Sequence, residues 1–446
     1  MSQARPGPPA RRAGRRPLVV VVGAGFAGLA TVSRLVRAGL RVTVVDRNVY
    51  STFQPLLYQV ATSGLNASDV SYPLRGFARK YGARFRHGEL AGIDGEAGQL
   101  TFADGSQLDY DYLILATGVS AAYYGVPGAQ EHSLGLYTRR DAIALRDQLM
   151  DGLETLSAAR ETSAARETGA ARETGAADHR EVGVTVVGGG ATGVELAGTL
   201  AELRSTAIPV TFPEVDPGRV HIRLVEQAGT LLGPFHPALR EYAGRQLRAR
   251  GVDVLLGTAI SEITADQVLL ADGRKLGSDL TVWAAGVKAP PAISRWNLPQ
   301  GRGGRILTGP DLRVAGYDRI FAVGDIALIQ DHPLPQLAQP ALQTGRHAAD
   351  QVRRLVAGQP TVPFAYHDKG TMATIGRRSA VVQLPSGLRL RGTIAWLAWL
   401  VLHLVTLLGN RNRISALINL TYRYLTWGRG GGVILGDDPP MPPGGS

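Results

Sequence analysis

Two glycine-rich turns, each set between an apolar strand and a helix, constrain this chain more than any other feature. The first turn is Gly23-Ala24-Gly25-Phe26-Ala27-Gly28, and the second is Gly188-Gly189-Gly190-Ala191-Thr192-Gly193. Strands are expected at 18–22, 41–45, 182–187 and 221–225, and helices at 29–38 and 194–204. The segment before the strand at 221–225, with Pro209, Pro213 and Pro217, is expected to be a loop. The second strand of each set runs into an acid, Asp46 or Glu226. This order predicts two βαβ units of the Rossmann type.

The glycine spacing in each turn meets the needs of a bound dinucleotide. Gly23 permits the tight turn, Gly25 lets the backbone approach a pyrophosphate, and Gly28 lets helix and strand pack closely. The helix N-terminus offers N–H groups to the phosphates, and Asp46 can accept hydrogen bonds from ribose hydroxyls. In the second unit the same roles are expected of Gly188, Gly190, Gly193 and Glu226.

Glu226 also indicates which nicotinamide nucleotide the second unit prefers. A carboxylate at this position repels a 2′-phosphate, and the following Gln227-Ala228 supply no arginine to bind one. The sequence therefore favours NADH over NADPH.

Three further strand-to-turn segments follow the order expected of an FAD enzyme. They are Tyr112–Gly118, Val282–Gly286 and Ile320–Asp325. Asp325 is expected to accept a hydrogen bond from the ribityl chain of the flavin, and Gly324 allows the backbone to approach closely.

Composition excludes some classes of chemistry. The chain has no cysteine, which excludes disulfides, metal–thiolate sites and electron transfer through a cysteine pair, and no metal is expected. The net charge of +11 comes partly from five arginines within residues 1–17. We expect a disordered basic tail there, or a contribution to binding anionic lipid. No nucleic-acid motif accompanies the charge, so no nucleic-acid partner is expected.

Residues 157–178 form a low-complexity insertion that contains a six-residue repeat, Ser-Ala-Ala-Arg-Glu-Thr. A period of six does not keep one face of a helix apolar, so we expect an exposed, mobile segment without a role in chemistry. Because alanine, arginine and glutamate favour helices, a helical repeat remains the alternative.

With these turns in place, the chain resembles the type II NADH dehydrogenases of the two-dinucleotide-binding flavoproteins. The more specific motifs are FQPLLYQVAT at 53–62, AQPALQTG at 338–345, KGTMATIG at 369–376 and a Trp-rich C-terminal region. The resemblance implies that NADH delivers a hydride to a non-covalent FAD, which passes two electrons to a membrane quinone, menaquinone or ubiquinone, without proton pumping. A soluble NAD(P)H-dependent FAD reductase for a protein acceptor is the alternative.

The turns and the resemblance together assign the binding residues. FAD is expected to contact Gly23, Gly25, Phe26, Ala27, Gly28, Asp46, Arg47, Gln54, Leu57, Thr117, Gly118, Gly324, Asp325 and Gln339. NADH is expected to contact Gly188, Gly190, Thr192, Gly193, Glu195, Glu226, Ala285 and Gly286.

The residues expected to carry the reaction are Glu195, Gln339 and Gln343. The two glutamines are four apart, so on a helix they share a face and can hydrogen-bond a quinone carbonyl; otherwise they are surface or capping amides. The resemblance places Glu195 between the nicotinamide and quinone regions, and the alternative is an acid that favours the helix dipole. Lys369 and Arg378 are expected to line the quinone entrance, unless they are solvated surface charges.

Residues 393–409, TIAWLAWLVLHLVTLLG, suggest contact with a membrane. As a helix this stretch spans about 26 Å, less than the roughly 30 Å of a hydrocarbon core. His403 interrupts it, and tryptophans and tyrosines suited to an interface continue to residue 427. We expect amphipathic helices lying on the cytoplasmic face of the cell membrane as a monotopic anchor. A single spanning helix and a buried or dimerisation helix are the alternatives.

The expected architecture is therefore α/β, with two Rossmann-type domains for FAD and NADH and a C-terminal membrane-associating helical segment. The FAD domain is expected at 18–140 and 301–365, the NADH domain at 141–300, and the C-terminal region at 366–446, with its anchoring helices at about 393–427. A homodimer is left open.

Overall fold

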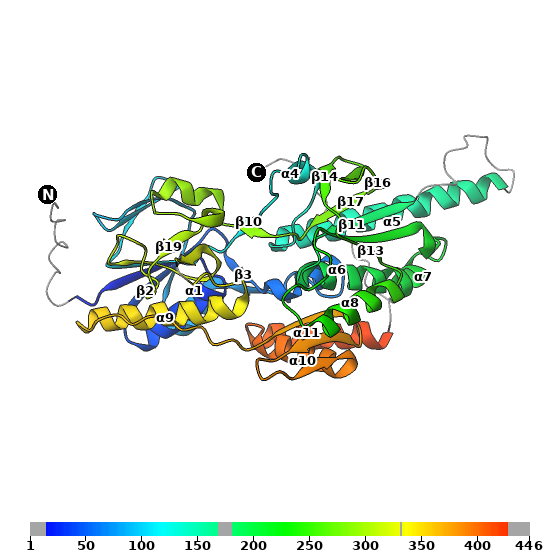
Figure 1. The fold of residues 1–446 in the computed structure, drawn as a ribbon. Helices are drawn as coiled ribbons and strands as arrows, with labels where there is room; N and C mark the ends of the chain where they lie inside the picture. The colour runs from blue at the N-terminus through cyan, green and yellow to red at the C-terminus, as the bar shows by residue number, and fades with distance from the viewer. Residues whose placement is uncertain (1–14, 168–180, 331, 427–446) are drawn as a thin grey trace. The chain divides into compact units, whose positions relative to one another are not determined.

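The computed structural model describes residues 15–167, 181–330 and 332–426, which divide into two compact units (Figure 1). Among these residues, the first unit draws on 15–49, 73–119 and 289–366, and the second on 50–72, 120–288 and 367–426. The segments 50–72 and 120–140, expected in the FAD domain, therefore belong to the second unit. The C-terminal region is also part of that unit.

The first unit is built on a parallel five-stranded sheet of order β20-β9-β1-β2-β5. Its strands are β1 (Leu18–Val22), β2 (Arg41–Asp46), β5 (Arg84–His87), β9 (Tyr112–Leu115) and β20 (Ile320–Ala322). The helix α1 (Phe26–Arg37) connects β1 to β2, which confirms the first predicted βαβ unit, although α1 begins three residues earlier than expected. The long helix α9 (Ala338–Val356) packs against α1.

Smaller elements complete the first unit. An antiparallel sheet pairs β6 with β7 and β7 with β8, and β19 pairs with β21 in parallel. Their core includes Leu100, Phe102, Trp296 and Ile306. The elements are α3 (Leu74–Tyr81), β6 (Leu90–Asp94), β7 (Gln99–Phe102), β8 (Gln107–Asp109), η4 (Pro291–Trp296), η5 (Arg302–Gly304), β19 (Ile306–Thr308), η6 (Gly324–Ile326) and β21 (Ala327–Ile329).

The second unit repeats the parallel design with four strands in the order β13-β12-β11-β17. The strands are β11 (Val182–Val187), β12 (Val220–Glu226), β13 (Asp253–Leu256) and β17 (Leu280–Trp283). The helix α6 (Ala191–Glu202) follows β11 directly, and α8 (Pro237–Ala249) lies between β12 and β13 in the sequence. The second predicted βαβ unit is thereby confirmed.

Short elements surround this second sheet, including an antiparallel sheet of β14, β15 and β16. Their bounds are β3 (Tyr50–Thr52), η1 (Gln54–Leu56), α2 (Leu57–Ala61), β4 (Ser71–Pro73), β10 (Ser120–Ala121), α4 (Ala129–His132), β14 (Ile260–Ile263), β15 (Gln267–Leu270), β16 (Lys275–Gly277) and β18 (Val287–Lys288). The strand β4 runs across the boundary between the two units.

Two expectations about irregular segments need correction. The proline-containing stretch before β12, expected as a loop, continues helically through η2 (Leu203–Ala207) and α7 (Ile208–Thr211), with η3 (Pro217–Arg219) before the strand. Pro209 lies at the second residue of α7, directly after the π-helical turn η2. The helix α5 (Arg139–Glu167) extends into the repeat, so the helical alternative holds to Glu167. The rest of the repeat, 168–180, and the basic tail, 1–14, lie outside the described residues.

The C-terminal region is a three-stranded antiparallel sheet followed by two helices. The strands are β22 (Thr371–Gly376), β23 (Ser379–Gln383) and β24 (Arg389–Arg391), and the helices are α10 (Gly392–Thr406) and α11 (Asn410–Thr426). Within residues 15–167, 181–330 and 332–426, no helix is both long and apolar enough to cross a bilayer, α10 included.

The helix α11 turns a polar stripe toward the protein. Asp69, which is buried, accepts hydrogen bonds from Ser415 Oγ at 2.6 Å and from Asn419 Nδ2 at 2.7 Å. Asn412 Nδ2 donates to the Ser71 carbonyl at 2.7 Å, and Arg423 Nη1 donates to Gln59 Oε1 at 2.8 Å. These four donors recur every three or four residues, so one face of α11 is fastened to the segment 59–71.

Apolar side chains of both C-terminal helices are exposed. On α10 they contrast with Ala395, Trp396 and Trp399, which are buried. The exposed apolar residues are Ile394, Leu397, Val401, Leu402 and Val405 on α10, and Ile414, Leu417, Ile418 and Tyr422 on α11. We call this set the apolar face. Its size exceeds the scattered apolar exposure usual for a soluble surface.

Replacing Asp69 should loosen α11 more than it changes the rest of the molecule. In Asp69→Ala, Ser415 and Asn419 lose a charged acceptor, which should lower the free energy of unfolding by about 3 kcal/mol. Thermal unfolding of the intact protein, with limited proteolysis to locate the loosened segment, measures this. Asp318→Ala is the control, because that side chain is 97% exposed. Equal effects of the two substitutions would show that the polar stripe does not fasten α11.

Candidate functional site

The glycine turn after β1 is shaped by close backbone contacts. Gly23 has a φ of +100°, and a Cβ there would come within 2.3 Å of the Ala116 carbonyl oxygen. A Cβ on Gly28 would lie 1.8 Å from the Gly23 carbonyl oxygen, whereas one on Gly25 would meet open space. The roles expected of Gly23 and Gly28 are thus visible in the packing. Gly25 caps α1 without a side-chain hydrogen bond, so the first N–H groups of α1 are available to a phosphate.

Asp46 holds this turn in place from the end of β2. Its Oδ2 accepts the Ala24 N–H and its Oδ1 accepts the Asn48 N–H, both at 2.7 Å. Burial raises the pKa of the carboxyl, while the hydrogen bonds from Asn48 and Ala24 oppose that shift. Each oxygen retains a lone pair that a ribose hydroxyl can reach. Arg47, beside it, is exposed.

Two buried polar atoms without partners mark the same edge of the first sheet. They are Thr117 Oγ1, after β9, and Asp325 Oδ1, after β20. Burial raises the pKa of Asp325 to about 6, and the positive charge of Arg305 limits the rise. Because β20, β9 and β1 are neighbours and parallel, Gly118, Asp325 and the first glycine turn meet at the carboxyl ends of adjacent strands. Buried polar groups normally have partners, so these orphaned atoms indicate a ligand site.

Close packing of α9 on α1 fixes the two glutamines of the first unit. A Cβ on Gly345 would lie 2.3 Å from the Ala27 carbonyl oxygen, and Thr31 Oγ1 donates to the carbonyls of Ala27 and Gly345 at 2.8 and 2.9 Å. Gln339 and Gln343 lie one turn apart on α9 and are both half-buried. The prediction that they share a helix face is confirmed.

The second unit repeats the first turn closely. Gly188 has a φ of +110°, and a Cβ on Gly193 would lie 1.9 Å from the Gly188 carbonyl oxygen. Glu226 accepts the Gly189 N–H through Oε2 and the Ala228 N–H, at 2.7 Å, through Oε1. Gly190 caps α6 without a side-chain hydrogen bond, and Thr192 is half-buried in the first turn of that helix.

The turn after β17 lies next to this site. A Cβ on Gly188 would come within 2.7 Å of the Ala284 backbone, and Gly286 lies so close to Tyr124 that a Cβ there would meet its hydroxyl at 2.1 Å. The Gly286 carbonyl accepts the Tyr137 hydroxyl at 3.2 Å. Ala285 and Gly286 therefore follow the strand beside β11, where the sequence placed them.

Glu195 is enclosed by residues from four elements. It is 8% exposed, and its Oε1 accepts the Thr374 N–H at 3.3 Å. Gly198 permits this approach, because a Cβ there would lie 2.4 Å from the Ile375 carbonyl oxygen. Burial raises the pKa of Glu195 to about 8, while the Thr374 N–H and the Trp399 indole favour the charged form. The carboxyl is therefore protonated at neutral pH.

The surroundings of Glu195 are aromatic and were not foreseen as a group. Tyr58 is buried, and burial, followed by the negative charge of Glu195, holds its pKa well above the usual value. Trp399 stacks on His403 with ring centroids 4.0 Å apart. Burial lowers the pKa of His403 to about 4, so this ring is neutral and its Nδ1 donates to the Trp399 carbonyl at 2.7 Å. This explains how a histidine is accommodated in an apolar helix.

Four other expected residues are not gathered into one site. Gln54 is exposed and Leu57 is 1% exposed, and both lie in the second unit, so Leu57 packs in the core and only Gln54 is open to a ligand. Lys369 precedes β22 and Arg378 follows it. The six residues of β22 lie between these two side chains, and a strand rises by about 3.3 Å per residue. Lys369 and Arg378 are therefore at opposite ends of the strand, too far apart to line one narrow opening.

Comparison with known proteins agrees with this geometry. A family model described as pyridine nucleotide-disulphide oxidoreductase matches residues 17–345, and one described as NDH2 C-terminal domain matches residues 368–429. Type II NADH:quinone oxidoreductase NdhA of Mycobacterium tuberculosis is 34% identical, over 94% of this chain and 89% of the relative. The corresponding enzyme of Staphylococcus aureus is 30% identical, over 82% and 89%.

Solved structures share the fold. NDH2 of Plasmodium falciparum in complex with NADH superposes with a TM-score of 0.83 at 19% identity, covering 94% of this chain and 100% of that one. The sulfide:quinone oxidoreductase of Aquifex aeolicus gives a TM-score of 0.68 at 18% identity, over 92% and 95%. The identity to the curated relatives along nearly the whole chain, together with both family models, shows that the chain belongs to the type II NADH:quinone oxidoreductases of the pyridine nucleotide-disulphide oxidoreductase family.

Proposed function

We propose that this chain is a non-proton-pumping NADH:quinone oxidoreductase that works at the surface of a membrane. The observation that carries the proposal is the pair of glycine turns, each braced by an acid that accepts its N–H groups. The relatives named above carry this activity in their names. Because the chain has no cysteine, electrons cannot pass through a disulfide as the wider family's name suggests.

The first unit has a donor and acceptor set that fits FAD. Gly25 and the first turn of α1 would hold the pyrophosphate, Asp46 a ribose, and Asp325 and Thr117 the hydroxyl-bearing linker. When bound, FAD supplies an acceptor for the hydride of NADH and a donor of two electrons to quinone. Asp325 Oδ1 and Thr117 Oγ1 are buried without a hydrogen-bond partner among the described residues, and FAD would provide one for each.

The second unit fits NADH better than NADPH. Both oxygens of Glu226 are already held by backbone N–H groups, so the carboxylate is fixed where the adenosine ribose would lie. A 2′-phosphate there would meet this negative charge at close range. Glu226 thus selects the unphosphorylated ribose.

For the reduction of quinone we propose roles for amide, ammonium and carboxyl groups. Gln339 and Gln343 would hydrogen-bond the quinone carbonyls, and Lys369 would attract the polar head. Arg378 is no longer included, because it lies at the far end of β22. Reduction of a quinone to a quinol takes up two protons, and Glu195, protonated at neutral pH, is suited to supply one of them.

The apolar face provides the membrane contact. The helix α11 holds its polar stripe against the protein, with Ala416 and Leu420 buried beside it, and exposes Ile414, Ile418 and Tyr422. A bilayer interface, at the cytoplasmic side, is the environment in which this arrangement lowers the free energy. We therefore propose a peripheral enzyme that takes quinone from the membrane on which it rests.

Rapid mixing under anaerobic conditions tests the activity. NADH should bleach the flavin of the pure protein, and a menaquinone or ubiquinone analogue should restore its colour. The alternative, a reductase for a protein acceptor, requires reoxidation by a ferredoxin-type protein and none by quinone. A flavin that NADH does not bleach would end both proposals.

Glu195→Gln should change the pH dependence of both rate and stability. Wild-type quinone reduction should fall as the pH passes about 8, because Glu195 then loses its proton, whereas the variant should be slower and show no such step. Between pH 4.5 and about 8 the unfolded carboxyl is ionised and the folded one is not, so the wild type loses stability as the pH rises.

The effect of Glu195→Gln on stability distinguishes a Glu195 that loses its proton near pH 8 from one that has only a structural role. The variant should gain on the wild type by up to about 1.4 kcal/mol per pH unit within that window. Unfolding curves measured from pH 5 to 8 give the comparison. Stability curves that run parallel would show that Glu195 is ionised at neutral pH, contrary to its proposed role.

A single charge in the apolar face should weaken membrane binding. Val401 is 59% exposed on α10, and Val401→Asp places a carboxylate where we expect acyl chains. Less protein should sediment with phosphatidylcholine vesicles, while reduction of a soluble quinone stays unchanged. Val362→Asp, at a valine 40% exposed in the first unit, is the matched control. Removing α10 altogether is less informative, because Trp399 is part of the core.

A further inference from the structure

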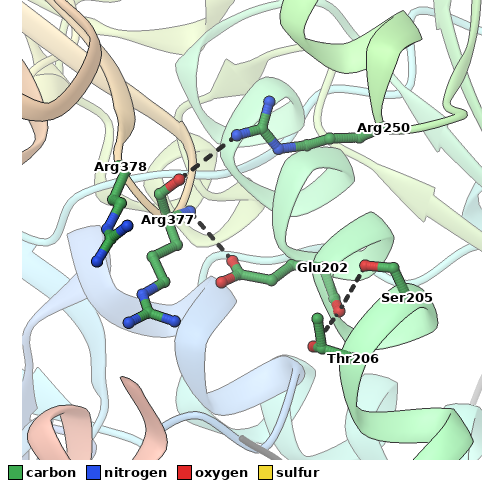
Figure 2. Close-up of a pocket in the computed structure, with 6 residues that line it drawn as sticks. All are labelled: Glu202, Ser205, Thr206, Arg250, Arg377 and Arg378. Carbon is green, nitrogen blue, oxygen red and sulfur yellow. Dashed lines mark hydrogen bonds between the residues drawn. The ribbon is translucent and has the colours of Figure 1, made fainter. Parts of the chain in front are cut away.

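A basic pocket lies at the turn between β22 and β23 and is not used by the proposed reaction. It has a volume of about 290 Å³ and is lined by Glu202, Ser205, Thr206, Arg250, Arg377 and Arg378 (Figure 2). All six residues belong to the second unit. Three guanidinium groups and one carboxylate give the lining a net formal charge of +2.

The backbone of the turn sets these arginines around the pocket. Arg378 has a φ of +56°, a conformation that a long side chain rarely adopts, and Arg377 precedes it in the turn. Arg250 reaches the turn from the end of α8, where its Nη2 donates to the Arg377 carbonyl at 3.4 Å. Figure 2 shows Arg377 and Arg378 extending from the turn and Arg250 bridging to it. Burial lowers the pKa of Arg377, and the charge of Arg378 lowers it further, so an anion would relieve their repulsion.

The other lining groups offer hydrogen-bond acceptors. Glu202 Oε2 accepts the Arg377 N–H at 3.2 Å, and its Oε1 is buried without a partner among the described residues. The hydroxyls of Ser205 and Thr206 donate to the Glu202 carbonyl, so each oxygen still has a free acceptor position. Arg250 Nη1 donates to the carbonyl and the side-chain oxygen of Gln246, so Arg250 contributes mainly its charge. The pocket therefore combines the positive charge of three arginines, which attracts an oxyanion, with acceptors for hydroxyl groups of the same ligand.

The pocket adjoins the apolar face. The Arg378 carbonyl accepts the Thr393 hydroxyl at 3.5 Å, and Thr393 precedes the exposed Ile394 on α10. The Arg377 guanidinium lies 5.5 Å from the ring centre of Tyr424, two residues after the exposed Tyr422 on α11. A ligand held here would have its charged part among the arginines and its apolar part at the level of the helices.

We infer that this pocket binds the headgroup of a membrane phospholipid whose phosphodiester is anionic and carries hydroxyl groups, as in phosphatidylglycerol. The arginines pair with the phosphate, and Glu202, Ser205 and Thr206 accept hydrogen bonds from the glycerol hydroxyls. The inference rests on the proposed membrane contact and adds a choice of lipid to it. One lipid per protein is bound at the edge of the apolar face.

Calorimetric titration tests whether the pocket binds this headgroup. The FAD-loaded full chain is titrated with short-chain phosphatidylglycerol, which is kept below its critical micelle concentration. Because the probe is soluble, the result does not depend on membrane docking, which sedimentation with phosphatidylcholine vesicles measures separately. The wild type should show one saturable site. Short-chain phosphatidylcholine, whose headgroup has a cationic amine and no hydroxyls, should bind more weakly.

Arg377→Gln combined with Arg378→Asn removes both turn charges, and asparagine tolerates the positive φ of position 378. Affinity for short-chain phosphatidylglycerol should fall about fivefold for each arginine. Arg295→Gln with Arg302→Gln removes two exposed arginines of the first unit and is the control for net charge. Glu202→Leu removes the side-chain acceptor for the glycerol hydroxyls and should lower the affinity for phosphatidylglycerol relative to that for short-chain phosphatidic acid, which lacks those hydroxyls.

Three results would overturn the inference. The first is the absence of a saturable site in the wild type. The second is an equal loss of affinity in the control, which would indicate attraction by overall charge alone. The third is binding of inorganic phosphate as tight as that of the lipid, which would make a soluble anion the ligand. Normal vesicle docking and normal quinone reduction alongside any of them would leave the proposed function intact.

Discussion

The hydrogen bond from a glycine-turn N–H to an acid at the end of the next strand is the contact on which the rest of the structure depends. Asp46 makes it to Ala24 in the first unit, and Glu226 makes it to Gly189 in the second. Each acid thereby ties the carboxyl end of one parallel strand to the turn after its neighbour. The first N–H groups of α1 and α6 then have no side-chain cap and point toward the edge where a dinucleotide is held. In the role that we propose for Glu226, the carboxylate that shapes the second turn also selects the nucleotide.

Much of this was open to prediction because the determinants are local. At Gly23 and Gly28 a Cβ would collide with nearby backbone atoms, so these positions require glycine. A required glycine can be recognised in the sequence. The strands, both βαβ units and the shared face of Gln339 and Gln343 followed from such short-range patterns. Boundaries were less secure: α1 begins at Phe26, and a proline at the start of α7 continues a helical stretch that had been expected as a loop.

What could not be predicted depends on contacts between distant segments. Nothing near Glu195 in the sequence reveals that Thr374, Tyr58 and Trp399 enclose it, yet that burial raises its pKa to about 8. Likewise, Lys369 and Arg378 were both expected at the quinone entrance, and a single extended strand separates them. The segment 50–72 was expected to stay with the first domain, but α11 binds it through Asp69 and Gln59, and it joins the second unit instead.

The C-terminal helices differ from helices folded for water in which side chains they expose. In water a helix gains free energy by burying its apolar side chains. The helix α11 buries Ala416 and Leu420, but it also turns Asn412, Ser415, Asn419 and Arg423 toward the protein and leaves two isoleucines exposed. Buried donors cost free energy unless they are paired, and each of these is paired with a protein acceptor. The polar bonds therefore fix the helix on the protein, and the apolar residues remain to meet lipid. An apolar face that rests on a membrane meets lipid headgroups at its rim. Beside this face the chain places Arg377 and Arg378 in one turn, and Arg378 has a positive φ, which long side chains rarely adopt. In the function that we propose, apolar contact docks the protein on the membrane, and the charge beside it selects the lipids.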